Sequence, residues 1–240
     1  DLKYCKKNKI KFLASVFDEK SLENLNKLNV DFIKLPSSEI SNFFLLKALS
    51  KIKTPVVFST GMATSKEISH AYKVLKINKK KVIPMYCVSS YPAKIEEVNI
   101  KKLIELKKKY NSIGLSDHTS SIETSVISSY LGVNIIERHL TLNNDLKGPD
   151  HSASLDPNEF KKFVDAVRNV QLLNSKIKIK NEMKNLKLVR KFLVAKNNIE
   201  KGQPFSVNNV TAKRTGGGLP SISFPNISGK KAKKNFVKDE

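Results

Sequence analysis

The sequence predicts an α/β protein: a (β/α)8 TIM barrel with six of its units present, followed by a small, mostly β module. Six short apolar runs alternate with six amphipathic segments, the order of a parallel sheet with right-handed helical crossovers. Five of these runs end in polar, functional-looking residues, and no glycine-rich phosphate loop follows any of them. An open doubly wound sheet concentrates its site at one switch point, whereas a barrel gathers every strand end around one mouth. The barrel is therefore favoured.

The expected strands are nearly continuous apolar runs, as required of strands whose two faces are both covered. They are, in chain order, IKFLASVF (10–17), VDFIKLPS (30–37), PVVFSTG (55–61), KVIPMYCVSSYP (81–92), SIGLSDH (112–118) and VNIIERHL (133–140). The segments between them repeat apolar residues with the 3.6-residue period of a helix. The expected helices are 21–28, 42–52, 64–77, 98–110, 120–132 and 157–173.

The character of the chain changes after residue 173. Residues 174–190 are polar and lysine-rich, which is typical of a linker or a connecting helix. Residues 191–240 contain short β-type runs broken by glycine, proline and asparagine turns, without helical periodicity. We therefore expect a barrel domain over 1–173, a linker over 174–190 and a small β module over 191–240.

The charge is strongly basic. The 240 residues include 44 Lys and Arg against 22 Asp and Glu, a formal net charge of +22. Only four of these cations are arginine, and the lysines are spread along the chain, whereas nucleic-acid binders usually cluster basic residues on one face with arginine prominent. We therefore expect a lysine-rich surface that attracts small anionic substrates and binds no nucleic acid; a polyanion partner is the alternative.

The composition also indicates the cellular compartment in which the protein works. With 40% hydrophobic and 28% charged residues the chain has globular composition. No apolar run approaches the roughly 18 residues of a membrane span, and no signal peptide opens the sequence. Two cysteines are too few for a disulfide framework. These features predict a cytoplasmic protein that does not bind membranes.

Two histidines are candidate metal ligands. His118 (in GLSDHT) and His139 (in IERHLT) follow neighbouring strands, so two imidazoles would enter one barrel mouth and form half of a divalent-metal site. The alternative is two unrelated histidines, one in a loop and one in the core. Asp117 and Glu137 are candidates for orienting the ligands, or else ordinary cap and salt-bridge residues.

Lys34 is the most unusual residue of the strands, because it interrupts the apolar run FIKLPSS. A lysine there needs an anion, which points to a phosphate or carboxylate ligand or to a Schiff base; pairing with Glu137 is equally compatible with the sequence. The hydroxyl groups at the strand ends, such as those of Ser37 and Ser59, either donate hydrogen bonds to a bound anion or cap the ends of the strands. Asp150, in the loop KGPDHSAS, is either a site residue or an acidic turn residue.

Taken together, six ordered motifs resemble the sialic acid synthase family: FIKLPSSE, VFSTGMAT, YCVSSYPAK, GLSDHT, ERHLTL and GPDHSASLDP. Those enzymes condense phosphoenolpyruvate with an N-acetylated hexosamine such as N-acetylmannosamine. The tail VAKNNIEKGQPFSVNNVTAKRTGGG resembles the antifreeze-like (SAF) domain that follows the barrel in that family. The resemblance covers essentially the whole chain and implies a domain-swapped homodimer.

The resemblance also implies roles for individual residues. His118 and His139 match manganese ligands, with magnesium or cobalt as alternatives to manganese. Lys34 and Asp150 join them as catalytic residues. The substrate-binding set is Ser15, Lys34, Ser37, Ser59 and Ser116 for phosphoenolpyruvate, Ser89, Tyr91 and Asp150 near the amino sugar, and Arg214 offered by the SAF domain to the partner subunit.

Departures from the family pattern are informative. The family begins with two strands that this sequence lacks, so we expect an N-terminally truncated barrel formed by strands three to eight, and a SAF domain that is incomplete at its C-terminus. Ser15 stands where threonine is common, Tyr86 where histidine is common, and Ser89 where some members carry asparagine. The last change is expected to affect which sugar is accepted.

The leading functional hypothesis is thus a phosphoenolpyruvate-dependent transferase of the N-acetylneuraminate synthase type, releasing phosphate by C–O cleavage with help from a metal. Legionaminate and pseudaminate synthases are the alternatives within the family. Outside it, a Schiff-base aldolase that uses Lys34 and a non-catalytic carbohydrate-binding protein also fit the residues.

Overall fold

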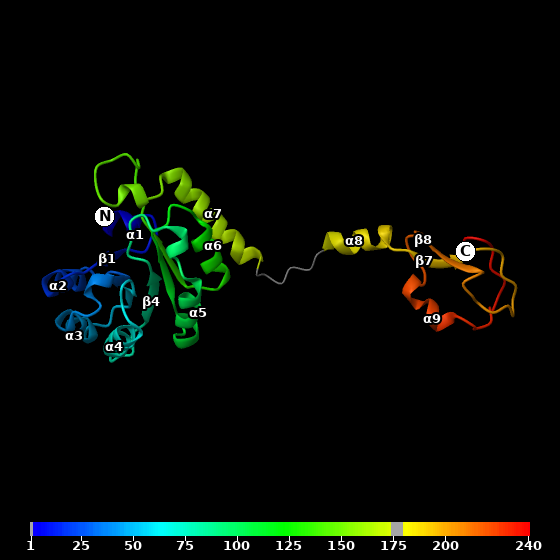
Figure 1. Cartoon of the computed structure of the whole chain (residues 1–240), viewed down its shortest axis with the longest axis horizontal. Coiled ribbons are helices and arrows are strands. Elements are labelled where there is room, and N and C mark those ends of the chain that lie inside the picture. The colour runs from blue at the N-terminus through cyan, green and yellow to red at the C-terminus, as the bar shows by residue number, and fades with distance from the viewer. Residues whose placement is uncertain (1, 174–179) are drawn as a thin grey trace. The chain divides into compact units, whose positions relative to one another are not determined.

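The computed structural model describes residues 2–173 and 180–240, which form two compact units, Asp1–Ser175 and Lys176–Glu240 (Figure 1). Residues 174–179 of the expected linker lie outside the described residues. The rest of that segment contains a helix, α8 (Lys180–Val189), so the connecting-helix alternative describes these ten residues.

The first unit is built on a six-stranded parallel sheet whose strands follow one another in sequence order. Each expected strand contains an observed one, and the observed strands are shorter. They are β1 (Leu13–Ser15), β2 (Phe32–Leu35), β3 (Val56–Ser59), β4 (Val82–Cys87), β5 (Gly114–Asp117) and β6 (Ile135–Arg138). Sequence order without a switch point is the arrangement of a barrel wall rather than of a doubly wound sheet.

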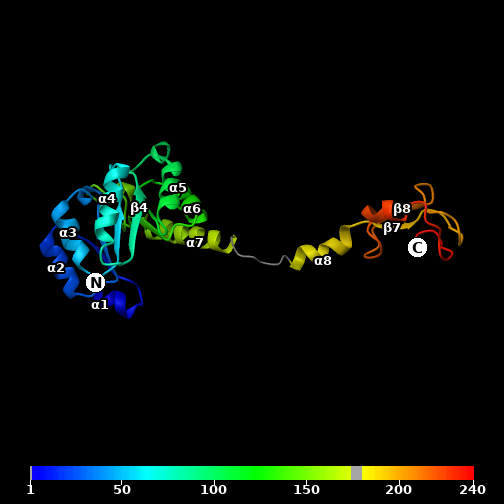
Figure 2. The same ribbon diagram turned by 90° about the horizontal axis from the view of Figure 1, so that it is seen from below.

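Helices precede, connect and follow the strands, and those between the strands cover one side of the sheet (Figures 1 and 2). They are α1 (Leu2–Lys7), α2 (Glu19–Lys27), α3 (Phe43–Lys51), α4 (Ser65–Leu75), α5 (Ile100–Lys109), α6 (Glu123–Tyr130) and α7 (Pro157–Leu173), with short 3-10 turns at Ser37–Glu39, Ile95–Glu97 and His151–Ala153. Local chemistry fixes their ends. Thr64 starts α4 through a capping box, in which its hydroxyl accepts from the Glu67 amide and Glu67 accepts from the Thr64 amide.

None of the described helices is long and apolar enough to cross a membrane.

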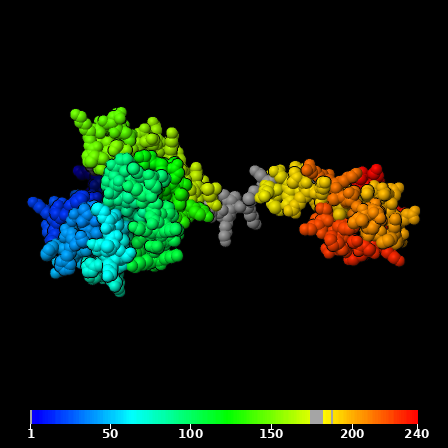
Figure 3. Space-filling view, viewed as in Figure 1, coloured from blue at the N-terminus to red at the C-terminus, as the bar shows by residue number. Residues whose placement is uncertain are grey.

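In the space-filling view, the residues of α2–α4 and those of α5 and α6 occupy adjoining parts of the first unit's surface (Figure 3).

The core of this unit lies between the sheet and the helices. Alternate strand residues such as Ile33, Phe58 and Leu115 are fully or almost fully buried on this outer face, in one cluster with helix residues such as Leu45 and Leu49 of α3. Because strand side chains alternate between faces, the intervening residues point to the inner face. Burying each large apolar side chain stabilises the fold by roughly 1.5–3 kcal/mol.

The sheet is strongly curved. Lys34 on β2 and Glu137 on β6 are separated by three strands, so a flat sheet would hold them about 19 Å apart at roughly 4.8 Å per strand. Their side chains instead meet at 2.5 Å from Lys34 Nζ to Glu137 Oε1. Curvature of this kind makes the sheet a barrel wall and brings the carboxyl ends of distant strands together.

The second unit is small. Besides α8 it contains an antiparallel pair, β7 (Phe192–Ala195) and β8 (Val210–Lys213), a 3-10 turn (Ser221–Ser223) and the short helix α9 (Phe224–Ile227). One isolated bridge joins Phe192 of β7 to Pro220, and two others join loop residues to one another. A small core forms around Ala195, Ile199, Val210 and Ala232. Its resemblance to a SAF domain stays a prediction.

Candidate active site

A cavity of about 300 Å³ opens at the carboxyl ends of the strands on the inner face. We call it the mouth. Its lining comes from strands or strand ends across the sheet: Ser15, Lys34, Pro36, Ser37, Ser59, Cys87, Tyr91, Ser116, His118, Glu137, Arg138 and His139. Period-two alternation explains most of this set, because most residues between these positions pack against the helices. Arg138, between Glu137 and His139, also reaches the lining, although its guanidinium pairs with Asp117.

An ion pair lies at the centre of the mouth. Lys34 is 5% exposed, and its ammonium donates to both carboxylate oxygens of Glu137, at 2.5 and 2.6 Å. Ser116 Oγ donates to the same carboxylate at 2.7 Å. Burial raises the pKa of Glu137, but the charge and hydrogen bonds of Lys34, together with the Ser116 bond, outweigh it and hold the pKa below its ordinary value. Glu137 is therefore ionised at neutral pH.

The two histidines lie side by side, with ring centroids 5.2 Å apart. His118 is 4% exposed, and its Nδ1 donates to the Val88 carbonyl at 2.7 Å, because a carbonyl oxygen can only accept. Its other nitrogen, Nε2, lies 3.3 Å from Ser116 Oγ inside the mouth. Burial is the main cause that lowers the pKa of His118, so the ring is neutral at pH 7 with a lone pair on Nε2.

This arrangement fits half of a metal site. A backbone carbonyl on one nitrogen of His118 orients the other, as is usual for metal-binding histidines. His139 lies on the neighbouring strand end, and its Nδ1 is 3.9 Å from Asp150 Oδ2. Among the described residues no three His, Cys, Asp or Glu side chains are placed to hold an ion together. Two imidazoles would thus leave several coordination positions for water or substrate.

Tyr91 covers both imidazoles. Its ring lies 4.2 Å from that of His118 and meets His139 edge-on at 5.7 Å, centroid to centroid. Burial, followed by the nearby negative groups, raises the pKa of Tyr91, so its hydroxyl keeps its proton and can donate a hydrogen bond. The aromatic ring limits access of water to the side of the histidines that it covers.

Hydroxyl groups surround the ion pair. Ser37 Oγ and Ser89 Oγ share a hydrogen bond at 3.2 Å. Ser59 Oγ is buried and has no hydrogen-bond partner in the described part of the chain. A buried hydroxyl without a partner is costly, and in the wall of a polar cavity it is available to a ligand. Ser15 lines the mouth from the edge strand β1.

Asp117 has a structural role. Its carboxylate forms an ion pair with Arg138 at 2.6 Å, and both side chains are buried. It also accepts from the Thr119 amide and hydroxyl and from Ser125 Oγ. The structure therefore shows Asp117 as a salt-bridge residue, and its hydrogen bond from Ser125 links the sheet to α6. Glu137 lies in the mouth, as the partner of Lys34.

The structure brings most of the expected site residues together, and it adds one. Cys87 lines the mouth beside Ser89 (Oγ to Sγ 3.8 Å), and burial raises the pKa of its thiol, so it is protonated at pH 7. Cys87 occupies an inward-facing position in the alternation of β4, and this pattern is the signal by which the sequence could have identified it as a site residue. Asp150 is half-exposed at the rim, close to His139. Arg214 belongs to the second unit, and its role stays a prediction.

Comparisons of the sequence with known proteins all indicate the same family. The model of the NeuB family matches residues 2–178. The chain is 40% identical to N,N'-diacetyllegionaminic acid synthase of Campylobacter jejuni, covering 99% of this chain and 73% of that protein. It is 34% identical to human N-acetylneuraminate-9-phosphate synthase, covering 99% and 68%.

A solved structure shows the same likeness. N-acetylneuraminic acid synthetase of Leptospira borgpetersenii is 32% identical and superposes with a TM-score of 0.69, over 76% of this chain and 65% of that one. The mouth occupies the carboxyl-end position at which barrels carry their active sites. The chain therefore belongs to the NeuB family of sialic-acid-type synthases.

Proposed function

We propose that this protein condenses phosphoenolpyruvate with the open-chain form of an N-acetylated hexosamine, giving a nine-carbon 2-keto sugar acid and inorganic phosphate. One observation carries the proposal. A buried lysine, an unpartnered serine hydroxyl and two adjacent histidines share one small cavity. These are the groups needed to hold a phosphorylated anion beside a carbonyl compound, and the family of the chain supports that use.

Phosphoenolpyruvate would bind to the Lys34 ammonium and the hydroxyls of Ser37, Ser59 and Ser116. Lys34 is already charged and oriented by Glu137, so little reorganisation accompanies binding. Ser15 would complete the anion site from β1. The net charge of +22 further favours the approach of an anion that carries both a carboxylate and a phosphate group.

His118 and His139 would hold a divalent metal, for which we propose manganese, with magnesium or cobalt as alternatives. When bound, the ion supplies Lewis-acid polarisation of the sugar's aldehyde oxygen. The neutral state of His118 and the carbonyl on its Nδ1 suit it to this task. Tyr91 and Asp150 would contact the sugar on the open side of the histidines.

The reaction needs no reactant besides phosphoenolpyruvate, the sugar and water. The electron pair of the enol double bond forms a bond from carbon 3 of phosphoenolpyruvate to the aldehyde carbon of the sugar, whose oxygen takes up a proton. Water adds to carbon 2 and loses one proton, which leaves a hydroxyl group there. The bond from carbon 2 to the phosphate oxygen then breaks, the phosphate leaves with the electron pair, and the hydroxyl loses its proton to give the 2-keto group. Lys34 and the serines stabilise the phosphate as its charge changes and keep it aligned.

For the sugar, the Campylobacter relative favours a diacetylated diamino hexose, because its identity of 40% exceeds the 34% of the human N-acetylneuraminate-9-phosphate synthase. The sequence alone placed N-acetylmannosamine first. Ser89, beside Ser37 in the mouth, is the residue we propose to bear on this choice. We further propose a cytoplasmic homodimer in which Arg214 serves the partner's site.

The experiment incubates the protein with phosphoenolpyruvate, Mn²⁺ and either N-acetylmannosamine or a diacetylated diamino hexose, and measures phosphate. Release that depends on the sugar supports the proposal, and a higher rate with the diamino sugar supports the substrate assignment. Release without any sugar would contradict a condensation.

An aldolase that uses Lys34 as a Schiff base is the second candidate from the sequence. The geometry argues against it, since the Lys34 nitrogen is held as a hydrogen-bond donor to both carboxylate oxygens of Glu137. Borohydride reduction in the presence of pyruvate should leave Lys34 unmodified. A covalent adduct there would favour the aldolase.

A further inference from the structure

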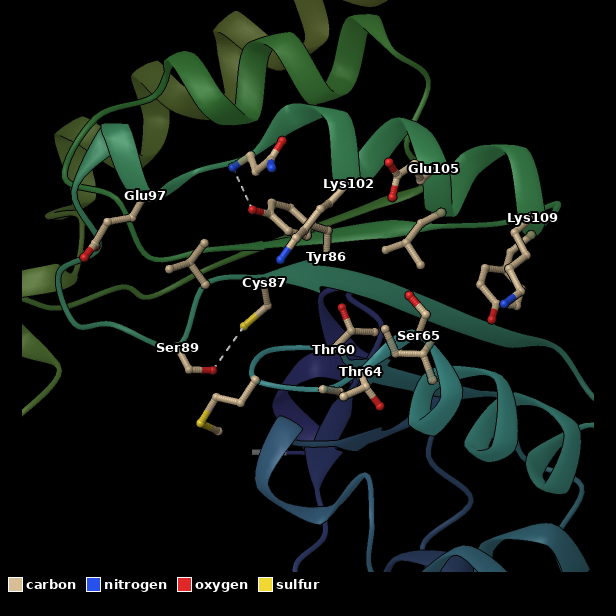
Figure 4. A pocket seen from close by; sticks show the side chains of 17 residues that line it. Thr60, Thr64, Ser65, Tyr86, Cys87, Ser89, Glu97, Lys102, Glu105 and Lys109 are labelled. Atoms are coloured by element: carbon tan, nitrogen blue, oxygen red, sulfur yellow. Dashed lines mark hydrogen bonds between the residues drawn. The ribbon is translucent and has the colours of Figure 1, made fainter.

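A second cavity lies on the helix side of β4, between α4 and α5 (Figure 4). We call it the α4–α5 groove. Its volume of about 660 Å³ is within the range of small-molecule sites and more than twice that of the mouth. The proposed condensation uses none of the helical residues that line the groove.

The groove exists because α4 and α5 meet mainly at one end. There Lys109 Nζ donates to Ser69 Oγ at 2.6 Å, and the rings of Tyr72 and Tyr110 pack 4.5 Å apart. Elsewhere the helices are held apart above Tyr86 of β4. The Tyr86 hydroxyl accepts from the Asn99 amide at 2.8 Å, which fixes the start of α5. The groove is thus pre-formed rather than a gap that closes by small adjustments.

The lining combines apolar walls with unused polar groups. Ile68 of α4 and Leu106 of α5 line it together with the Tyr86 ring. The Lys102 ammonium extends into the groove above Tyr86 (Figure 4) and has no ion pair or hydrogen bond within the described residues. Tyr110 also lines the groove, and its buried hydroxyl has no partner in the part of the chain that the structure describes.

We propose that the α4–α5 groove binds a small amphipathic anion: a molecule with a flat apolar body and one carboxylate, sulfonate or phosphate group. The body would lie between Ile68 and Leu106 on the Tyr86 ring, and the anionic group would pair with Lys102. An acceptor on the ligand would satisfy the Tyr110 hydroxyl. The lining also includes the carboxylates of Glu97 and Glu105, and Lys109 already donates to Ser69. The anionic group is therefore assigned to Lys102, which has no partner within the described residues, and the apolar wall sets the shape of the ligand.

The groove shares a wall with the mouth. Val88 lines the groove, and its carbonyl accepts the hydrogen bond that orients His118. Ser89 lines the groove and contacts Ser37 of the mouth. A ligand in the groove therefore changes the contacts of the backbone that positions a proposed metal ligand. This coupling rests on the proposed function, whereas binding to the groove does not.

Binding can be measured with the fluorescent aromatic sulfonate 1-anilinonaphthalene-8-sulfonate. The charge reversal Lys102→Glu and the groove-filling Leu106→Trp should each raise the Kd of the probe at least about tenfold. The matched control Lys101→Glu, one residue away on α5 and outside the groove lining, should leave the Kd within about twofold. Equal affinity in wild type and both groove variants would overturn the proposal; should Leu106→Trp not fold, the exposed site Lys102 still decides it.

Two further measurements show where the probe binds and test the coupling between the groove and the mouth. Excess phosphoenolpyruvate should leave the probe bound; displacement would place the probe in the mouth and overturn the proposal. Manganese affinity measured by calorimetry should change at least about twofold when the groove is saturated, and equal affinity would overturn the coupling. A protein that binds no manganese at all would contradict the proposed function while the groove titration still stands.

Discussion

Glu137 and Arg138 are neighbours in β6, yet they form ion pairs on opposite faces of the sheet. Glu137 meets Lys34 on the inner face, where the Glu137 side chain is 34% exposed. Arg138 meets Asp117 on the outer face, where neither side chain is more than 1% exposed. The two pairs have similar N–O distances, 2.5 and 2.6 Å, so geometry alone does not separate them.

The difference lies in what surrounds each pair. The Asp117–Arg138 pair is closed in by Thr119, by Ser125 of α6 and by the Phe163 ring of α7, and its side chains are at most 1% exposed although Arg138 borders the mouth. The Lys34–Glu137 pair opens into the mouth. Identical chemistry therefore serves stability on one face and, in our proposal, a ligand on the other.

The largest expected effect comes from breaking the closed pair. Arg138→Met would leave the Asp117 carboxylate buried without its cation, which costs about 3–5 kcal/mol in the free energy of unfolding. Urea denaturation followed by circular dichroism measures this. The control Lys161→Met removes an exposed pair with Asp165 and should stay within about 1 kcal/mol of wild type. A loss as small as in the control would show that the two faces do not differ.

The open pair should affect substrate more than stability. Lys34→Met should lower the rate of phosphate release by about 10²- to 10³-fold, because the proposed main contact to the anion is lost. Glu137, being partly exposed, keeps its Ser116 hydrogen bond, so unfolding should change less than in Arg138→Met. Full activity in a folded Lys34→Met protein would refute the role of Lys34.

The histidines test the mouth separately from its ion pair. His118→Ala should weaken manganese binding more than about tenfold by calorimetry, since one of two proposed ligands is removed. His70→Ala, on the exposed surface of α4, is the matched control and should bind as wild type does. Unchanged affinity in His118→Ala would contradict the metal assignment.

A further test concerns a buried cation without a carboxylate. Lys80 donates to the carbonyls of Leu49 and Ile52, has no ion pair within the described residues, and burial lowers its pKa from 10.5 to about 8. Between pH 8 and 10.5 the unfolded chain therefore binds more protons, and the Lys80 contribution to the free energy of unfolding rises with pH. The difference between wild type and Lys80→Met should show this rise; a difference independent of pH would contradict it.

Much of this comparison could be predicted from the sequence. Apolar runs with polar ends predicted all six strands and the side of the sheet where Lys34, Ser116 and His118 gather. Strand parity predicts that Glu137 and Arg138 point in opposite directions. The strands proved shorter than the runs: β4 ends at Cys87, and 88–92 form the loop that carries Tyr91 over the histidines.

The rest depends on contacts between residues far apart in the chain. The sequence allowed Lys34 either an anionic ligand or Glu137, which is 103 residues away, and only the curvature of the sheet decides that they meet. The α4–α5 groove was equally hidden. It results from the distance at which Tyr86 and Asn99 hold α5, and each helix by itself shows an ordinary amphipathic pattern.

The most direct test of the central claim follows the bridging oxygen of phosphoenolpyruvate. The substrate is labelled with ¹⁸O between carbon 2 and phosphorus and incubated with Mn²⁺ and a diacetylated diamino hexose. Attack by carbon 3 followed by C–O cleavage predicts that the label leaves with inorganic phosphate and that a nine-carbon keto acid accumulates in equal amount. Label retained in the keto acid, or phosphate released without the nine-carbon product, would contradict the account.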